Sequence, residues 1–355
     1  LVLEYNRVER FYTGGSAIDE WQKFDNPVDS NMSEELLVNT NEYIGPGKPF
    51  DHGYSQTVIN GTRISLKSLI DNHTKALLGE KYEHISNLQS GVLCKVGDST
   101  GRLILQYHPT KEFAEKELHS FYGKTEAWYI LKTRDDGPHF CYAGFKKHVT
   151  RELFFNLFIN NDVPGMLECI HRVYFNKGDM ILIKAGMIHA MGAGATFLEI
   201  HEPCDYTFRF ERDNYGRHME DNDLHYGLGN EKLFDGLSFS TFTEEEIRKQ
   251  IVIPRKTISS INHCTQYEIL GYDQCAEFKA DIIDIRGSYF VPDFDGHYII
   301  VAVEGDVELV SGESNKTLIQ GKAAFIPAAV KSLIVRGKQS QILITYPFRI
   351  EERNF

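Results

Sequence analysis

The sequence predicts a mainly β protein made of two small jelly-roll β-barrels, with helices inserted into the first. Three observations favour this fold class. Alternating and β-branched segments recur along the chain, helical segments with capping residues lie between them, and one glycine-strand-turn pattern occurs twice, about 140 residues apart. Jelly rolls pack two antiparallel sheets face to face, which suits strands with one apolar face.

The strands are predicted from apolar segments with a period of two residues, rich in β-branched and aromatic side chains. In the first part of the chain these segments are 91–98, 101–108, 126–132, 139–145, 173–186 and 195–212. From about residue 255 the chain reads as short strands separated by glycine-containing turns. The clearest pair there is 298–310, with its turn at Glu304-Gly305-Asp306.

The helices are predicted from apolar residues at helical spacing and from capping residues. The expected helical segments are 65–82, 110–123, 150–172 and 243–251. Thr110 is placed to cap the second of these, which should run to about Gly123. Thr243 and Glu246, three residues apart, form a capping-box pattern that opens the last one.

The repeated pattern covers residues 178–189, "GDMILIKAGMIH", and 321–332, "GKAAFIPAAVKS". Each copy has a glycine, a five-residue segment, a Lys or Pro, two small residues, two further residues, and then His189 or Ser332. Two copies favour two barrels. Because only the first copy ends in a metal-binding side chain, only the first barrel is expected to hold a metal.

The length of 355 residues is sufficient for two domains. We expect an N-terminal metal-binding β domain with helical insertions at residues 1–254. A degenerate β domain without metal should follow at residues 255–355. The net charge of −12 argues against nucleic acid as a partner, because a phosphate backbone requires a basic surface.

The cysteines and the hydropathy pattern bear on the compartment. Six scattered cysteines without a C-x-x-C pair are typical of thiols in a reducing environment. No apolar stretch approaches the roughly 18 residues that a membrane span needs. The first residues, "LVLEYNRVERFYTGG", lack the features of a signal peptide. We therefore expect a cytoplasmic protein without a membrane partner, as a monomer or homodimer.

Four polar side chains occur within strand-forming segments. Gln106 and His108 are two residues apart and so should lie on one face of a strand. Glu126 opens the next strand, and His189 ends the first copy of the repeat. Each alone is most simply a satisfied core or edge residue. Together, two imidazoles, a carboxylate and an amide oxygen suit Zn²⁺, with Fe²⁺, Mn²⁺ and Co²⁺ as competitors.

The motifs QYHP, GKTEAWYIL, GMIHAMGAG and FLEIHEPCDYTFRFER together resemble the class I mannose-6-phosphate isomerases, and the repeated pattern resembles the second half-motif of cupins. The resemblance is strongest over residues 90–215 and closest to the short bacterial members. It implies two cupin-type jelly rolls and one divalent metal, with zinc expected. The implied metal ligands are Gln106, His108, Glu126 and His189.

The same resemblance implies that Lys124, Glu199 and Arg209 are catalytic residues. The substrate would be a sugar phosphate, and the reaction the interconversion of mannose 6-phosphate and fructose 6-phosphate through a cis-enediol(ate). Two positions depart from the family: Ile104 stands where a serine or threonine helps to hold phosphate, and His201-Glu202 replaces a Gln-Gln or Gln-Glu pair.

Two alternatives stay open at this point. Ile104 favours an isomerase of another or unphosphorylated sugar. A metal-holding, sugar-binding cupin without turnover is the second alternative. The set Lys124, Glu199 and Arg209 favours turnover, because a binder would not need it. The general base is not identified; His201 could serve as the base or lie behind the metal ligands.

Arg209 follows Glu199 by ten residues on one extended segment. The even spacing puts both on one face, but ten strand residues span about 33 Å, too far to touch one small sugar. Pro203 interrupts the ladder of a strand. We therefore expect a break near Pro203-Cys204 that returns Arg209 to the mouth of the pocket.

Overall fold

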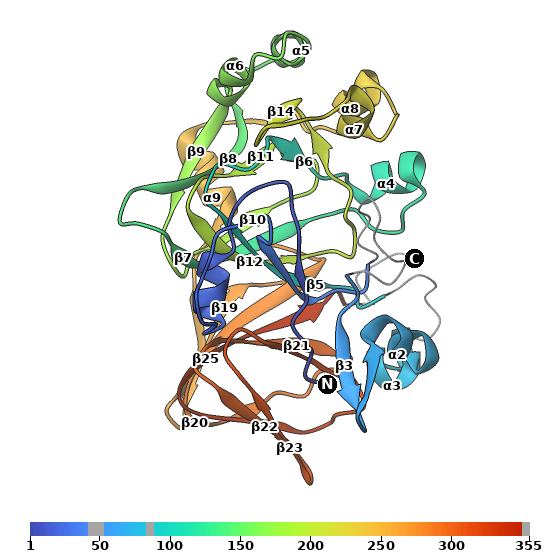
Figure 1. Ribbon diagram of the computed structural model, residues 1–355, viewed down its shortest axis with the longest axis vertical. Coiled ribbons are helices and arrows are strands. Elements are labelled where there is room, and N and C mark those ends of the chain that lie inside the picture. The colour runs from blue at the N-terminus through green and yellow to red at the C-terminus, as the bar shows by residue number, and fades with distance from the viewer. Residues whose placement is uncertain (42–52, 83–88, 350–355) are drawn as a thin grey trace.

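The computed structural model describes residues 1–41, 53–82 and 89–349 (Figure 1). Within them lie 25 strands, nine α-helices and one 3-10 helix, so the predicted mainly β class is confirmed. The last residues of the predicted second domain, 350–355, lie outside the described part of the chain.

The first β region contains two sheets. The larger has seven antiparallel strands in the order β1-β2-β5-β12-β7-β10-β17. Its strands are β1 (Arg7–Val8), β2 (Glu34–Val38), β5 (Leu93–Ser99), β12 (Ala195–His201), β7 (Glu126–Thr133), β10 (Met180–Ile183) and β17 (Val252–Ile253).

The second sheet has the order β13-β6-β11-β8-β16, with β9 paired to β8. Its strands are β13 (Phe208–Arg209), β6 (Gln106–Tyr107), β11 (His189–Met191), β8 (His139–Lys146), β16 (Thr241–Phe242) and β9 (Ile170–Phe175). Only β16 pairs in parallel; the other neighbours are antiparallel.

The facing sides of these two sheets form one apolar interior. Trp128 and Ile130 of β7 pack there with Cys141 of β8 and Phe197 of β12. Side chains alternate along a strand, so Tyr129 points to the opposite face. The interior is therefore reached by Glu126, Trp128 and Ile130 from the same strand.

Helices cover the outer face of the six-stranded sheet, at the top of Figure 1. They are α5 (Arg151–Ile159), α6 (Val163–Glu168), α7 (Asp221–His225) and α8 (Asn230–Asp235). Phe154, Met166, Leu224 and Phe234 of these helices pack with Phe208 in one buried cluster. This layer fixes the outer side of the strands that carry Gln106, His189 and Arg209.

The opposite face of the seven-stranded sheet packs on a second β region. That region has an eight-stranded sheet in the order β18-β19-β20-β25-β21-β24, with β22 on β25 and β23 on β22. Its strands are β18 (Lys256–Ile261), β19 (Cys264–Leu270), β20 (Phe278–Val291), β25 (Leu333–Pro347), β21 (Tyr298–Glu304), β24 (Ala323–Ile326), β22 (Val307–Ser311) and β23 (Ser314–Leu318).

One apolar cluster joins the two β regions. Tyr129 and Leu198 from the first pack with Ile282 and Phe325 from the second. A separate cluster, with Ile283 and Ile300, fills the interior of the second region. The chain changes sheet between β17 and β18, but the division into domains 1–254 and 255–355 stays a prediction.

Three predicted helices are shorter than expected. Residues 150–172 form α5 and α6 rather than one helix, because Asn161 adopts φ 52° between them, and Ile170–Arg172 belong to strand β9. Residues 65–82 form α2 (Leu66–Asn72), α3 (Thr74–Leu78) and the 3-10 helix η1 (Glu80–Tyr82) rather than one continuous helix, because His73 leaves the helical conformation with φ −141°. Thr110 caps α4 (Lys111–Leu118) as predicted, but the helix ends at His119, with φ 52°, and does not reach Gly123.

The second predicted cap is confirmed, and a further cap occurs at the start of α5. Thr150 accepts a hydrogen bond from the Leu153 amide at the start of α5. The capping box of Thr243 and Glu246 opens α9 (Glu244–Ile251). Elements without a clear sequence signal are α1 (Ser16–Trp21), the hairpin β3 (Gln56–Ile59) with β4 (Thr62–Ser65), and the hairpin β14 (Asp213–Asn214) with β15 (Arg217–His218).

Both copies of the sequence repeat have the same local structure. Gly178 and Gly321 adopt φ of +88° and +84°, a conformation that costs glycine little, and each lies two residues before a strand, β10 or β24. The first copy ends at His189, at the start of β11. The second ends at Ser332, directly before β25.

Two findings concern the compartment. All six cysteines are unpaired and buried, as the predicted reduced thiols require. Among the described residues, none of the helices has the length and apolar character needed to cross a membrane.

Candidate metal centre and active site

Three predicted ligands converge between the two sheets of the first β region. His108 follows β6, Glu126 opens β7 and His189 opens β11. All three are buried, and their ligand atoms lie within 4.8 Å of one another. The two carboxylate oxygens of Glu126 lie 3.1 Å from His108 Nε2 and 3.3 Å from His189 Nε2.

The hydrogen bonds of the two imidazoles determine which nitrogen each presents to Glu126. His108 Nδ1 lies 2.9 Å from the Tyr206 carbonyl, and His189 Nδ1 lies 2.8 Å from the Met187 carbonyl. A carbonyl only accepts, so we assign the proton of each neutral ring to Nδ1. Each Nε2 then carries a lone pair directed toward the carboxylate, which is the arrangement of a metal-binding histidine.

Burial and the nearby Lys124 ammonium lower the pKa of His108 to about 4, so its ring is neutral at pH 7. His108 Nε2 is buried and has no hydrogen-bond partner among the described residues. Two lone pairs and a carboxylate around one point repel each other unless a cation lies between them. The residues therefore fit a divalent metal.

Gln106 is brought to the same place. It is the cross-strand partner of His189, and its amide nitrogen lies 3.3 Å from His189 Nε2. Because the two ends of an amide are assigned from hydrogen bonds, rotation of the group would present the oxygen instead. The four predicted ligands thus lie together; their role as ligands stays a prediction.

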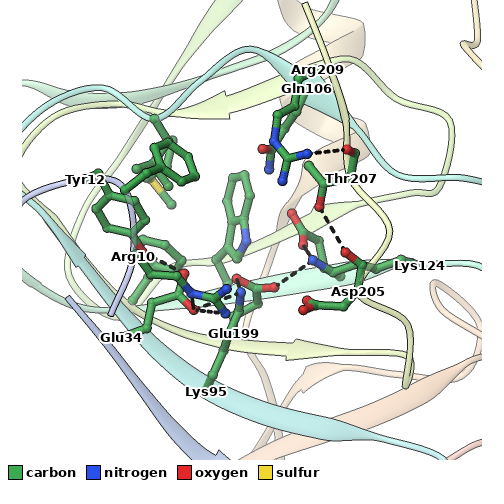
Figure 2. Close-up of a pocket in the computed structure, with 16 residues that line it drawn as sticks. Arg10, Tyr12, Glu34, Lys95, Gln106, Lys124, Glu199, Asp205, Thr207 and Arg209 are labelled. Atoms are coloured by element: carbon green, nitrogen blue, oxygen red, sulfur yellow. Dashed lines mark hydrogen bonds and ion pairs between the residues drawn. The ribbon is translucent and has the colours of Figure 1, made fainter. Parts of the chain in front are cut away.

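A continuous series of buried ion pairs extends from Glu126 (Figure 2). The Lys124 ammonium lies 3.2 Å from Glu126 and 3.3 Å from Glu199. Lys95 lies 3.3 Å from Glu199 and 3.4 Å from Glu34. Arg10 contacts Glu34 at 2.6 Å, at the far end of the series.

These neighbours shift the pKa values of the carboxyl and ammonium groups. Burial opposes the charge of Lys124, but Glu126 and Glu199 raise its pKa above the ordinary value. Burial likewise opposes ionisation of Glu126, but Lys124 and the imidazoles lower its pKa well below the usual range. Burial, assisted by the Glu126 charge, raises the pKa of Glu199 to about 7. Among these carboxyl and ammonium groups, Glu199 is therefore the one with a pKa closest to pH 7.

Arg209 lies on the wall of the pocket opposite Lys95 and Glu199, as Figure 2 shows. Strand β12 ends at His201, and the chain crosses to the other sheet, where Arg209 in β13 pairs with Gln106. The predicted break near Pro203-Cys204 is confirmed. The guanidinium donates a hydrogen bond to the Thr207 carbonyl at 3.0 Å.

One expectation about an individual residue needs correction. Ile104 does not lie in the pocket; it is fully buried in the cluster beneath the helices, and its neighbour Leu103 lines the pocket. Residues 101–105 are not a regular strand, so alternation does not bring Ile104 onto the face of Gln106. His201, for which two roles were left open, lines a smaller cavity with Lys95 and Asp205 rather than the pocket of Glu126, and its Nδ1 donates to the Glu202 carbonyl at 2.6 Å.

Several pocket residues were missed by sequence reasoning. They are Arg10, Tyr12, Glu34, Lys95 and Thr207. Lys95 had a signal, since a charged residue inside the apolar strand 91–98 is unusual without a partner. Arg10, Tyr12 and Glu34 come from an irregular segment and reach the site only because β1 and β2 join the edge of the sheet.

Two packed sheets with a buried His-Glu-His group, followed by a second jelly-roll region, define a two-barrel protein of cupin type. No family model matches the sequence. Over 154 residues the chain is 27% identical to the mannose-6-phosphate isomerase ManA of Bacillus subtilis, which covers 42% of this chain and 47% of that protein. It is 31% identical over 151 residues to the mannose-6-phosphate isomerase of Streptococcus mutans, covering 40% and 45% respectively.

These alignments span less than half the length of the curated relatives. The structure comparison covers far more of the chain. The crystal structure of the mannose 6-phosphate isomerase from Bacillus subtilis matches over 97% of this chain and 98% of its own, with a TM-score of 0.74 and 18% identity. The predicted resemblance to this family is confirmed by these names, and the shared fold by the superposition.

Proposed function

We propose that the chain is a metal-dependent aldose–ketose isomerase that interconverts mannose 6-phosphate and fructose 6-phosphate through a cis-enediol(ate). One observation carries this proposal. A buried centre suited to a divalent metal shares a pocket with two buried lysines, the carboxyl group of Glu199 and Arg209. The named relatives, all mannose-6-phosphate isomerases, give independent support.

His108, Glu126 and His189, with the amide oxygen of Gln106, would hold the metal, for which we propose zinc. A bound zinc ion supplies positive charge that polarises the oxygens of the open-chain sugar. The other residues act directly on the substrate. Isomerisation needs a group that moves a proton between C1 and C2 and fixed positive charge where negative charge develops.

Lys124 supplies part of that charge. Glu126 and Glu199 hold its ammonium in place and keep it protonated. Glu199 lines the same pocket, and we assign to it either the transfer of the proton or the orientation of a sugar hydroxyl. Arg209, on the opposite wall, would hold the phosphate or the enediolate through its planar fork. The Thr207 side chain lines the pocket beside it.

Further expectations accompany this proposal. The six unpaired cysteines support a reducing compartment, and we propose the cytoplasm. We also propose a metal-free second barrel and either a monomer or a homodimer.

A coupled assay tests the function. Protein purified without chelator and reconstituted with zinc is incubated with mannose 6-phosphate, fructose 6-phosphate, mannose and fructose. We expect turnover of the two phosphates and its loss after chelation. Preference for the free sugars would identify an isomerase of unphosphorylated sugars. Binding of sugar without turnover of any of the four would identify a binding protein.

A further inference from the structure

The indole N–H of Trp128 is a buried donor without a protein partner. The side chain is 2% exposed and lines the pocket, yet Nε1 has no hydrogen bond among the described residues. A buried donor left unpaired carries its full desolvation penalty. The other tryptophan, Trp21, shows the usual solution, because its Nε1 donates to the Val303 carbonyl at 2.7 Å.

An unpaired acceptor lies on the adjacent strand. Glu199 in β12 is the direct cross-strand partner of Trp128 in β7, and both side chains line the pocket. Side chains of directly paired residues are close neighbours on one face of a sheet. Glu199 Oε1 is buried and lies 3.3 Å from the Lys124 ammonium, but it makes no hydrogen bond. A donor and an acceptor on directly paired residues thus both lack a hydrogen bond, although the acceptor is ion-paired with Lys124.

A hydroxyl group complements this pair. It accepts a hydrogen bond from an N–H and donates one to a carboxylate at the same time. A phosphate dianion does not suit the position, because it has no hydrogen to donate to Glu199 Oε1. The pair therefore favours the polyol part of the sugar.

We propose that Trp128 is a specificity-determining residue: its N–H donates to one hydroxyl of the sugar, and that hydroxyl donates to Glu199 Oε1. This inference rests on the proposed isomerase function and deepens it. The direction of the N–H is fixed by packing, since the indole stands edge-to-face against His189, with ring centroids 5.7 Å apart, and tilted against Phe197, with ring centroids 5.8 Å apart. A fixed donor recognises a hydroxyl at little cost in conformational entropy.

The test compares Trp128→Phe with the unchanged protein on mannose 6-phosphate and on its 3-deoxy and 4-deoxy analogues. Phenylalanine keeps an aromatic ring but removes the donor. In the unchanged protein, we expect kcat/KM for one of the two analogues to be about 10-fold below that for mannose 6-phosphate, as loss of one hydrogen bond predicts. On mannose 6-phosphate, kcat/KM of the Trp128→Phe variant should be about 10-fold below that of the unchanged protein. Within the variant, kcat/KM for the same analogue should be less than 2-fold below that for mannose 6-phosphate.

The ratio of analogue to parent within the variant does not depend on how much of the variant is folded. If each analogue lowers kcat/KM by the same factor in the variant as in the unchanged protein, Trp128 binds water rather than substrate. That result would overturn the inference. Failure of the unchanged protein to turn over mannose 6-phosphate would instead refute the proposed isomerase function, which separates the two failures.

A binding measurement gives a readout without turnover. In Trp21→Phe, Trp128 is the only tryptophan, because the chain contains two. Titration with mannitol 1-phosphate, an unreactive polyol phosphate, should shift the Trp128 emission to longer wavelength as the N–H gains a polar partner. Saturable binding by calorimetry with an unchanged spectrum would contradict the proposed contact.

Discussion

Two backbone carbonyls decide the chemistry of the candidate metal centre at the scale of single residues. Those of Tyr206 and Met187 accept from Nδ1 of His108 and His189, which leaves both Nε2 atoms as lone-pair donors. Met187 and Tyr206 lie within the motifs GMIHAMGAG and FLEIHEPCDYTFRFER, but a motif does not say which carbonyl a histidine ring will reach. The four candidate ligands could therefore be predicted from the sequence, whereas the assigned tautomers depend on how the chain folds around the two rings.

Replacement of Glu126 by Gln should abolish metal binding. The carboxylate is the single anionic group of the four predicted ligands, and without it only neutral donors remain. We expect elemental analysis to give one equivalent of metal in the unchanged protein and below a tenth in Glu126→Gln. The matched control is Glu199→Gln, the same change on the neighbouring strand, which should keep its metal.

Retention of one equivalent by Glu126→Gln would show that the predicted site is wrong. A second equivalent in the unchanged protein would contradict the expectation that the barrel ending its repeat in Ser332 is free of metal.

Replacement of Arg209 by Ala should lower turnover by about 10²-fold, as loss of a preorganised charged donor does, while the metal content stays at one equivalent. Arg209 lines the same pocket as Glu126 and pairs through its backbone with Gln106, and its guanidinium bonds to the Thr207 carbonyl rather than to the Glu126 carboxylate. Arg209→Lys keeps a positive charge but lacks the planar guanidinium, so its turnover should lie between that of the unchanged protein and that of Arg209→Ala. Full activity in Arg209→Ala would remove it from the mechanism, and loss of metal would make it structural.

At the scale of elements, alternation along strands explains both the success and the limits of sequence reasoning. Gln106 and His108 were expected on one face from alternation, and the structure brings both to the site although β6 covers only Gln106–Tyr107. Glu126 opens β7, a strand of eight residues. The place of Ile104 could not be predicted by alternation, because the chain before β6 is irregular. Pro203 marked the break that returns Arg209, since proline removes a ladder hydrogen bond.

Helix ends were predicted less well than helix starts. A start depends on a local side-chain cap, as Thr110 and Thr243 show. The end of α4 depends on His119 adopting φ 52°, a conformation that non-glycine residues rarely adopt and that its sequence does not announce.

Removal of the cap on α9 should destabilise the protein. Thr243→Ala loses the hydrogen bond to the Glu246 amide, at a cost of about 1 kcal/mol in the free energy of unfolding. Ile247 and Ile251 of this helix pack in the interior with Trp128, so the loss should be felt globally. Urea unfolding measures it, with Thr243→Ser, which keeps the cap, as the control. Equal stability of all three proteins would mean that the cap contributes nothing.

At the scale of the whole molecule, the site depends on contacts between distant segments. Arg10 and Glu34 reach Lys95 only because the first strands join the edge of the seven-stranded sheet. Hydropathy and motif patterns describe segments near one another in sequence, so this long-range charge series could not be derived from them. The layer order, by contrast, follows from β7 and β12 being buried on both faces.

His297 links the two β regions and should make the stability of the protein sensitive to acid. Its fully buried ring lies 2.6 Å from the Ser90 carbonyl and stacks on Phe325. Burial lowers the pKa of His297 to about 4, whereas the unfolded chain takes up the proton near pH 6.5. Between these values the unfolded state binds more protons, so stability present above pH 6.5 is lost progressively as the pH falls toward 4.

His297→Gln removes this titration, and its unfolding free energy in urea should fall less between pH 7 and pH 5 than that of the unchanged protein. All other titratable groups are present in both proteins, so their contributions cancel in the comparison. His218→Gln is the control, because His218 is exposed beside Asp213 and its loss should leave the steep fall in place. The same fall in His297→Gln as in the unchanged protein would show that His297 is not the acid-sensitive link between the two β regions.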